Sequence, residues 1–362
     1  MQKVLICLIS RELLPNIISV IALKPNKVIL ISSEDVKAQK EDFVKILKTQ
    51  YSIHDIEEKE CNVFNPNEIV KTINSFLPSL QESEVILNWT GGTKPLALFS
   101  YVRLSTLPNV KMLYVDTQHE LFWWMINRVV SQEEFNVNLP IKTLLHSKGR
   151  WDFEKGDKNE FNDLMPFIYD LLKRRGTIEL KKLHSLISDK KRVFNYFKLK
   201  NYELYNRGDS IEIKSIDNKF CEYLSFKNYN FLNGVWLEYY TMKILSETNE
   251  YDDIAVSVII NQLTSKENVP YYNEIDVLAI RNSVPIFIEC KTRAIVQDDI
   301  YKLTNLRKEF GSPFSQAVLI STVSANKLNK IKAQKNNVII LDNLNKLKSE
   351  LTRLHEYMVT SS

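Results

Sequence analysis

The 362-residue chain has few of the residues that define several protein classes. Its four cysteines lie far apart and form no CxxC pair, which argues against a disulfide framework or a cysteine zinc site and favours a reducing compartment. Only eight glycines and eleven prolines are present, so long flexible linkers are not expected. The composition, 44% hydrophobic and 25% charged, is that of an ordinary globular protein and excludes a mainly disordered chain.

Long hydrophobic runs are also missing. The apolar run at residues 4–9 is far shorter than the roughly 20 residues that a membrane-spanning helix needs. It also lacks the small-residue cleavage site of a secretory signal. We therefore interpret this run as a buried first strand and expect a cytoplasmic protein without membrane contact.

The net charge of +4 is unevenly distributed. Residues 1–145 carry a net charge of −1, residues 146–230 carry +5, and residues 231–362 are neutral. A basic segment between two near-neutral parts is typical of nucleic-acid contact, although a solvated helix face explains the charge equally well. We therefore expect three parts with these boundaries. Much of the positive charge of residues 146–230 lies in basic runs at 173–175, 181–182 and 190–192.

Strand and helix patterns alternate through residues 1–145. Strands are expected at 4–9, 27–32, 51–58, 85–89, 110–115 and 121–126, and helices at 35–50, 65–77 and 95–105. This alternation predicts an α/β domain with a mostly parallel sheet between two layers of helices.

The two later parts differ in pattern. Residues 146–230 predict a small α+β connector in which helices precede a hairpin, an order that resembles a winged-helix module. Its expected helices are 161–173, 177–187 and 192–199, and its strands are 203–205 and 210–214. Residues 231–362 predict a second α/β domain. Its expected helices are 233–247, 298–310 and 325–334, and its strands are 254–263, 274–280, 285–290, 317–321 and 338–341.

Charged residues interrupt two apolar strands of this last domain. Glu289 and Lys291 are two residues apart and project to one face, whereas Cys290 points to the core. Asp276 lies on the preceding strand, and a hairpin would bring it beside them. Two carboxylates and the Cys290 carbonyl form a hard-oxygen site for Mn²⁺ or Mg²⁺, where Lys291 could orient or deprotonate a water or stabilise phosphoryl charge. A surface ion pair between Glu289 and Lys291 is the alternative.

These residues resemble the PD-(D/E)xK nuclease superfamily, with Asp276 as the aspartate and residues 289–291 as the (D/E)xK element. The resemblance implies a restriction-endonuclease-like fold and metal-dependent cleavage of phosphodiester bonds. Members often carry a glutamate on a helix before the core sheet, and Glu238 in the run WLE fits that role. The proline usually written before the aspartate is replaced by Ile275.

A loop with the sequence TGGTK joins the strand at 85–89 to the next helix. Its glycines let a ligand approach the backbone, and the helix start offers free N–H groups to phosphate. The loop matches neither the Walker A motif nor GxGxxG, and a capped strand-to-helix turn is the alternative. Its candidate ligand contacts are Thr90, Gly91, Gly92, Thr93 and Lys94.

Ligands of parallel sheets bind beyond the carboxyl ends of the strands. The loops after the strands at 4–9 and 110–115 should meet the TGGTK loop there, with the end of the strand at 27–32 nearby. They add the candidate contacts Ser10, Arg11, Asn16, Ser33 and Thr117.

The segments LIS at 8–10, PN at 15–16 and NWTGGTK at 88–94 resemble a CARF domain, the CRISPR-associated Rossmann-like sensor. A CARF domain ahead of a PD-(D/E)xK nuclease resembles the stand-alone effectors of type III CRISPR antiviral systems. This resemblance covers residues 1–145 and 231–362, and the connector matches only by position and length. It implies a homodimer that binds a cyclic oligoadenylate, most often cyclic tetra-adenylate. It also implies cleavage of DNA, as single strands or by nicking duplexes, and in some members of RNA.

Three alternatives stay open. An ungated restriction or repair nuclease would cut without a ligand. A nucleotide-responsive DNA-binding regulator would use the connector as a winged helix and carry an inactive nuclease domain. A self-limiting sensor would hydrolyse its own activator, although no obvious general base lies near the TGGTK loop.

Overall fold

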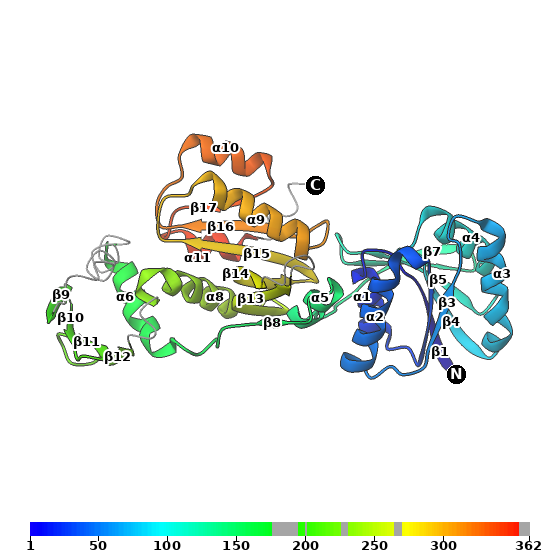
Figure 1. Ribbon diagram of the computed structural model, residues 1–362, viewed down its shortest axis with the longest axis horizontal. Helices are drawn as coiled ribbons and strands as arrows, with labels where there is room; N and C mark the ends of the chain where they lie inside the picture. The colour runs from blue at the N-terminus through cyan, green and yellow to red at the C-terminus, as the bar shows by residue number, and fades with distance from the viewer. Residues whose placement is uncertain (176–194, 200, 226–230, 264–269, 355–362) are drawn as a thin grey trace. The chain divides into compact units, whose positions relative to one another are not determined.

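The computed structural model describes residues 1–175, 195–199, 201–225, 231–263 and 270–354 (Figure 1). The chain divides into two compact units by its internal contacts. Unit 1 comprises Met1–Asp152, Ile280–Pro285 and Phe310–Ser315, and unit 2 comprises Phe153–Ala279, Ile286–Glu309 and Gln316–Ser362. The contacts of the predicted connector, from Phe153 onwards, therefore group it with most of residues 231–362.

Unit 1 contains a sheet with the strand order β3-β2-β1-β4-β5-β6-β7. Its strands are β1 (Gln2–Leu8), β2 (Lys27–Ser32), β3 (Ile56–Glu60), β4 (Ser83–Asn88), β5 (Val110–Asp116), β6 (Leu121–Ile126) and β7 (Val129–Glu134). Its helices are α1 (Leu14–Leu23), α2 (Lys37–Gln50), α3 (Pro66–Phe76), α4 (Lys94–Leu104) and α5 (Ile141–Ser147). The strands from β3 to β5 pair in parallel, and β6 and β7 add antiparallel pairs at one edge. Helices α1 and α2 cover one face and α3 and α4 the other, as Figure 1 shows, which confirms the predicted three layers.

Local sequence signals set the helix boundaries in unit 1. The side chain of Asn65 accepts hydrogen bonds from the first backbone N–H groups of α3, and Pro66 occupies the first helical position. The hydroxyl of Thr93 caps α4 by accepting from the N–H of Leu96. Because the central strands are covered on both faces, their apolar runs are continuous rather than alternating.

Unit 2 contains two sheets, one with the order β17-β16-β15-β14-β13-β8 and a smaller one with the order β12-β11-β10-β9. The strands of the large sheet are β8 (Phe153–Glu154), β13 (Asp253–Leu263), β14 (Pro270–Arg281), β15 (Val284–Lys291), β16 (Gln316–Ser321) and β17 (Ile339–Leu341). Those of the small, antiparallel sheet are β9 (Tyr196–Leu199), β10 (Tyr202–Asn206), β11 (Ser210–Ser215) and β12 (Cys221–Ser225). The helices are α6 (Met165–Arg175), α8 (Trp236–Thr248), α9 (Gln297–Phe310), α10 (Lys327–Lys335) and α11 (Leu347–Thr352).

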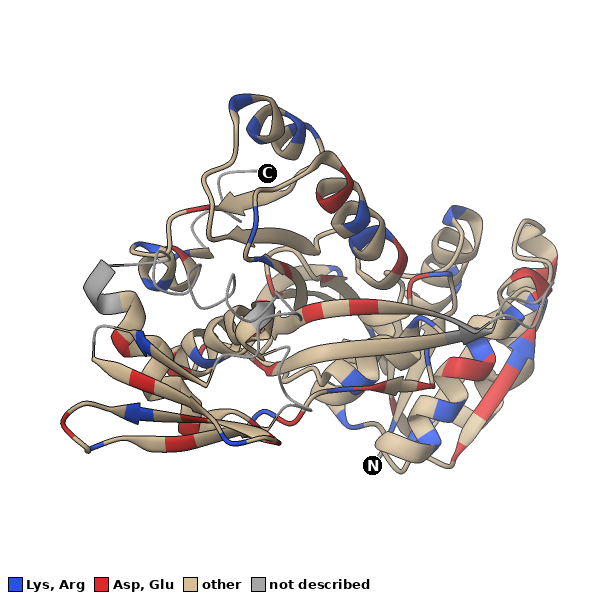
Figure 2. Cartoon of the chain, turned by 60° about the vertical axis from the view of Figure 1, so that its left-hand side comes forward, with Lys and Arg blue, Asp and Glu red and all other residues tan. Residues whose placement is uncertain are grey.

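One hydrophobic cluster runs through unit 2, from Leu204 and Ile213 of the small sheet through Trp236 of α8 to Ile288 of β15. The small sheet itself carries both charge signs, as Figure 2 shows. The basic runs at 181–182 and 190–192 lie outside the described residues, as does the predicted helix at 177–187.

Most expected elements are confirmed to within a few residues. The strand expected at 51–58 is confirmed only at 56–58, since β3 begins at Ile56, and α5, α11, β7 and β12 were not expected. Helix α1 was not predicted, because most residues of its first two turns are buried and an apolar stripe is therefore hidden. The placement of Asn16 in a loop is wrong, since it lies in α1. The expected helix over 192–199 is wrong at 196–199, where pairing with β10 forms a strand instead. No helix among the described residues is long and apolar enough to span a membrane.

Candidate active site

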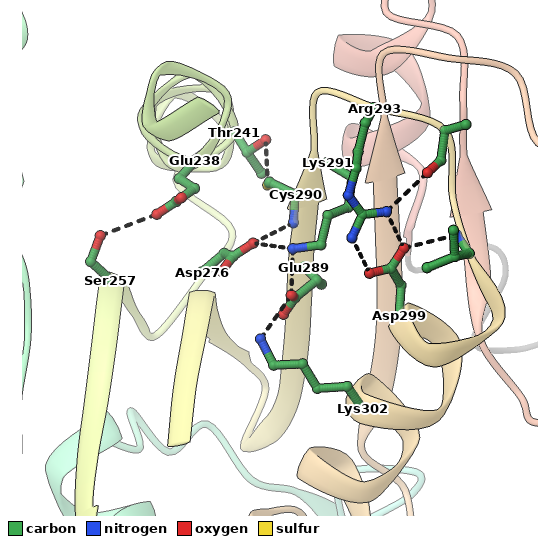
Figure 3. A network of polar contacts seen from close by, with 12 residues as sticks. Glu238, Thr241, Ser257, Asp276, Glu289, Cys290, Lys291, Arg293, Asp299 and Lys302 are labelled. Atoms are coloured by element: carbon green, nitrogen blue, oxygen red, sulfur yellow. Dashed lines mark hydrogen bonds and ion pairs between the residues drawn. The ribbon is translucent and has the colours of Figure 1, made fainter. Parts of the chain in front are cut away.

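The three side chains predicted to form the catalytic patch meet on the neighbouring strands β14 and β15 (Figure 3). The Nζ atom of Lys291 lies 2.5 Å from Oε1 of Glu289 and 3.7 Å from Oδ2 of Asp276. Asp276 and Glu289 are only 5% and 1% exposed, and β15 lies between β14 and β16. The alternative of a surface ion pair is therefore wrong for this site.

The backbone of Cys290 is turned towards Asp276. Its N–H donates a 2.7 Å hydrogen bond to Oδ2 of Asp276. The next carbonyl, that of Lys291, accepts from the N–H of Thr322 beyond β16. Because successive carbonyls of a strand point to opposite sides, the Cys290 carbonyl lies on the β14 side with Asp276. The thiol is buried towards α8, with Sγ 3.8 Å from the hydroxyl of Thr241.

The two oxygens of Glu289 have different surroundings. Oε1 accepts hydrogen bonds from Lys291 and, at 2.9 Å, from Lys302 of α9. Oε2 is buried and has no hydrogen-bond partner among the described residues. A buried carboxylate oxygen without a partner is costly, and a cation would satisfy it.

The donor set for such a cation consists of oxygens. The described residues contain no group of three His, Cys, Asp or Glu side chains that could hold a metal ion. We expect a cation here to be held by one carboxylate from each of Asp276 and Glu289 together with the Cys290 carbonyl. Carboxylate and carbonyl oxygens suit Mn²⁺ or Mg²⁺, whose remaining positions water and substrate phosphate usually fill.

Glu238, on the first turn of α8, borders this patch. It is 9% exposed, and the hydroxyl of Ser257 on β13 donates a 3.1 Å hydrogen bond to its Oε2. Burial, with a further contribution from the charge of Asp276, raises the pKa of Glu238 to about 8. Glu238 therefore takes up a proton more readily than an exposed glutamate does.

The charges of the other groups follow from burial and from one another. Burial, and then the nearby charge of Glu289, raises the pKa of Asp276 to about 7. Burial by itself would lower the pKa of Lys291, but Asp276 and Glu289 outweigh this effect and raise it. The site thus places a firmly charged ammonium beside a carboxyl group that titrates near neutral pH.

Sequence reasoning missed Lys302 and Ser257. A lysine on a helix and a serine on a strand belong to no motif, and only the packing of α9 and β13 shows their partners. The helix expected at 298–310 follows the (D/E)xK strand in the sequence. Its polar residues could therefore have been considered as candidates for contacts with Glu289. Arg293 and Asp299, also missed, form a bidentate pair at 2.7 and 2.8 Å that secures the turn after β15.

In unit 1, the loops after β1, β4 and β5 line a common pocket. Four predicted ligand contacts contribute to its lining, namely Ser10, Thr90, Gly91 and Thr117. Arg11 and Lys94 are exposed, and Ser33 lines a different pocket. The carboxyl ends of these parallel strands therefore bring together only part of the predicted set.

Other predicted contacts hold the TGGTK loop itself. Asn16 is fully buried, where its Nδ2 donates to the carbonyl of Leu8 and its Oδ1 accepts from Asn88. The Thr90 hydroxyl accepts a 2.7 Å hydrogen bond from the N–H of Val115, and Thr93 caps α4. These side chains shape the turn, so a ligand placed there would meet mainly the backbone and Lys94.

The two glycines meet different constraints. A Cβ atom on Gly91 would lie 2.3 Å from the carbonyl oxygen of Leu8, so only glycine fits between the loop and the end of β1. Gly92 has a φ of +80°, a left-handed backbone conformation that glycine adopts readily because it has no Cβ atom.

Two acidic side chains in the pocket lining contact basic side chains. Glu12 accepts a 2.8 Å contact from Nζ of Lys148, and Asp116 lies 2.8 Å from Nδ1 of His119. Burial works against the charged form of Asp116, but the hydrogen bonds from His119 outweigh it and lower the pKa. Such pairing reduces the repulsion that an anionic ligand would meet.

Comparison with known proteins identifies both folded parts. Two family models match the chain, the Card1 CARF domain at residues 4–143 and the Card1-like endonuclease domain at residues 226–358. A comparison with curated proteins found no match.

Three solved structures resemble the chain over nearly its whole length. Can2 from Sulfobacillus thermosulfidooxidans, in complex with cyclic tetra-adenylate, is 20% identical with a TM-score of 0.72 and covers 98% of this chain and 99% of its own. Protein VC1899 from Vibrio cholerae is 18% identical with a TM-score of 0.79 and covers 99% of both chains. A type III CRISPR defence DNA nuclease activated by cyclic oligoadenylate is 12% identical with a TM-score of 0.60, and covers 98% of this chain and 52% of its own. The fold and the two family matches together show that the chain combines a Card1-type CARF domain with a Card1-like endonuclease domain.

Proposed function

We propose that the endonuclease domain hydrolyses DNA phosphodiester bonds with Mn²⁺ or Mg²⁺, and that a cyclic oligoadenylate bound by the CARF domain switches it on in type III CRISPR defence. The observation that carries the proposal is the buried cluster of Asp276, Glu289 and Lys291 with its unpaired Glu289 oxygen. RNA is proposed as a second substrate class.

Each residue of the cluster has a role in this chemistry. Asp276, Glu289 and the Cys290 carbonyl would hold the cation, which when bound polarises a phosphoryl oxygen and acidifies a water. Lys291 keeps its proton, so we assign it to stabilising the charge on the reacting phosphate rather than to deprotonating the water. Burial raises the pKa of Glu238, so this group can assist by donating or accepting a proton.

The ligand proposal rests on the pocket in unit 1. Its loops lie at the carboxyl ends of parallel strands, at the start of α4 and beside the exposed Lys94. A cyclic tetra-adenylate carries phosphates that suit free N–H groups and a lysine, and Can2 is a structural relative solved with that ligand. Gating further requires the ligand to bind the active arrangement more tightly than the resting one.

We expect this gating to be visible in a cleavage assay. Supercoiled plasmid, single-stranded DNA and single-stranded RNA are incubated with Mn²⁺ or Mg²⁺, with and without cyclic tetra-adenylate. Cutting should require both the metal and the ligand, and Glu289→Gln should lower it at least about 1,000-fold, because it removes a charge that the transition state needs. Cutting without the ligand would instead support an ungated restriction or repair nuclease. Sequence-specific DNA binding with no cutting would support the regulator.

We also propose that the CARF domain forms a homodimer through α4 and the neighbouring strands. Leu98 and Val102 on α4 are 57% and 53% exposed, and Tyr114 and Trp123, a cross-strand pair on β5 and β6, are 40% and 37% exposed. Exposed apolar side chains of this size usually mark an interface. Because α4 begins directly after the TGGTK loop, a two-fold interface there would bring two ligand loops towards one axis.

Charges placed on this surface should separate the dimer. Leu98→Glu combined with Val102→Glu is expected to convert a dimer into a monomer in light scattering coupled to gel filtration, because two buried carboxylates would repel across the axis. Leu328→Glu, at an equally exposed leucine on α10, is the matched control and should leave the dimer intact. A monomeric wild type, or a dimer that survives the double substitution, would contradict this interface.

A further inference from the structure

Lys302 contacts the same carboxylate oxygen as the lysine of the (D/E)xK element. Its Nζ lies 2.9 Å from Oε1 of Glu289, and that of Lys291 lies 2.5 Å from the same atom. Figure 3 shows the two ammonium groups approaching from different elements, β15 and α9. One oxygen of Glu289 thus accepts two cations, whereas Oε2 has no partner among the described residues.

The side chains of Lys291 and Lys302 differ in their exposure and in the carboxylates that they contact. The side chain of Lys291 is 19% exposed and also lies 3.7 Å from Asp276. That of Lys302 is 45% exposed, and its polar contact within the described part of the chain is Glu289. Lys302 can therefore withdraw into solvent without breaking a direct contact with Asp276, whereas Lys291 cannot.

A second ammonium at this carboxylate has a cost for cation binding. A divalent ion held by Glu289 and Asp276 would face two positive charges within a few ångströms, in a site too buried for water to screen them fully. Without the ion, however, a carboxylate that is 1% exposed is stabilised by the ammonium groups that contact it. The same contact therefore favours the metal-free site and opposes the metal-bound one.

We propose that Lys302 is a positioning residue whose ammonium group supplies, in the metal-free protein, the positive charge that a bound divalent cation would supply to Glu289. It neutralises Glu289 in the metal-free protein and is displaced from that carboxylate when the divalent cation binds. This inference rests on the proposed metal-dependent function and adds to it an internal competitor that lies on α9, outside the (D/E)xK element at residues 289–291.

The test is a calorimetric titration of Mn²⁺ into the full-length protein without nucleic acid or cyclic nucleotide. Lys302→Met should bind Mn²⁺ at least about threefold more tightly than the wild type, because one repulsive charge is gone. Its metal-free melting temperature should fall, because Glu289 loses a partner, and saturating Mn²⁺ should raise it by more than in the wild type. Lys302→Arg keeps the charge and should restore wild-type values.

Lys308→Met is the matched control, since Lys308 is an exposed lysine on the same helix, and it should leave Mn²⁺ affinity unchanged. Equal or weaker Mn²⁺ binding by Lys302→Met would overturn the proposal, while Mn²⁺ binding by the wild type would leave the nuclease assignment standing. If the wild type bound no Mn²⁺ at all, both proposals would fail. Should Lys302→Met not fold, Lys302→Gln, which keeps a donor without the charge, takes its place with the same expected result.

Discussion

Asp276→Asn should abolish DNA cleavage and at the same time stabilise the metal-free protein at alkaline pH. Cleavage should fall at least about 1,000-fold, because the variant loses one of two anionic metal ligands. Stability should rise because burial, together with Glu289, places the pKa of Asp276 at about 7, well above its ordinary value of 3.8. Asparagine keeps an oxygen that can accept the Cys290 N–H.

The sign of the stability change follows from proton linkage. Between about pH 4 and pH 7 the folded protein binds a proton at Asp276 that the unfolded chain has lost, so the free energy of unfolding falls as pH rises through this window. Above it the wild type carries the full cost of a buried charge, and asparagine removes a cost on the order of 1 to 3 kcal/mol.

Urea unfolding in a chelator measures this difference directly. Asp276→Asn should be more stable than the wild type at pH 8.5, and the gain should shrink towards pH 4. Asp298→Asn, at an exposed aspartate in the first turn of α9, is the matched control and should change neither cleavage nor the pH dependence of stability. An Asp276→Asn protein that is less stable than the wild type at pH 8.5, or that still cuts, would contradict the assignment.

Gly91→Ala should disrupt the TGGTK loop more than any other substitution that adds one methyl group to this loop. The new Cβ atom would lie 2.3 Å from the carbonyl oxygen of Leu8, so either the loop or the end of β1 must move. We expect the free energy of unfolding of the CARF domain to fall by about 3 kcal/mol or more. Binding of cyclic tetra-adenylate should be lost with the shape of the loop.

Gly92→Ala is the matched control for this change. Its φ of +80° makes alanine strained, but the nearest atom is the flexible Leu96 side chain at 3.0 Å, so the expected cost is about 1 to 2 kcal/mol. Thermal unfolding and calorimetric titration of the ligand would rank the two variants. A Gly91→Ala protein as stable as Gly92→Ala would contradict the close contact with Leu8.

The sequence was informative where backbone geometry alone decides which residues meet. Glu289 and Lys291 share a face because strands alternate, and the hairpin brings Asp276 to them, so all three could be predicted from spacing. Continuous apolar runs likewise predicted the buried parallel strands. Residues brought in by helix packing could not be predicted in this way, as Lys302 shows.

Hydroxyl and amide side chains were harder to assign than charged ones. Thr90, Thr93 and Asn16 are as suited to bonding a neighbouring backbone group as to bonding a ligand, and sequence patterns do not separate these uses. In the structure all three bond other parts of the fold. The expectation that Lys94 is available to a ligand agrees with its exposure, and its ligand contact stays a prediction.

The hydrogen bond from the Cys290 N–H to Asp276 also makes one backbone amide a natural spectroscopic probe. An amide that donates to a carboxylate at 2.7 Å senses the charge of that carboxylate through its proton and nitrogen chemical shifts. A single resonance, from selective ¹⁵N-cysteine labelling of a chain with only four cysteines, would follow both the loss of the Asp276 proton and the arrival of a cation. The catalytic centre could thus be observed during titration without any substrate present.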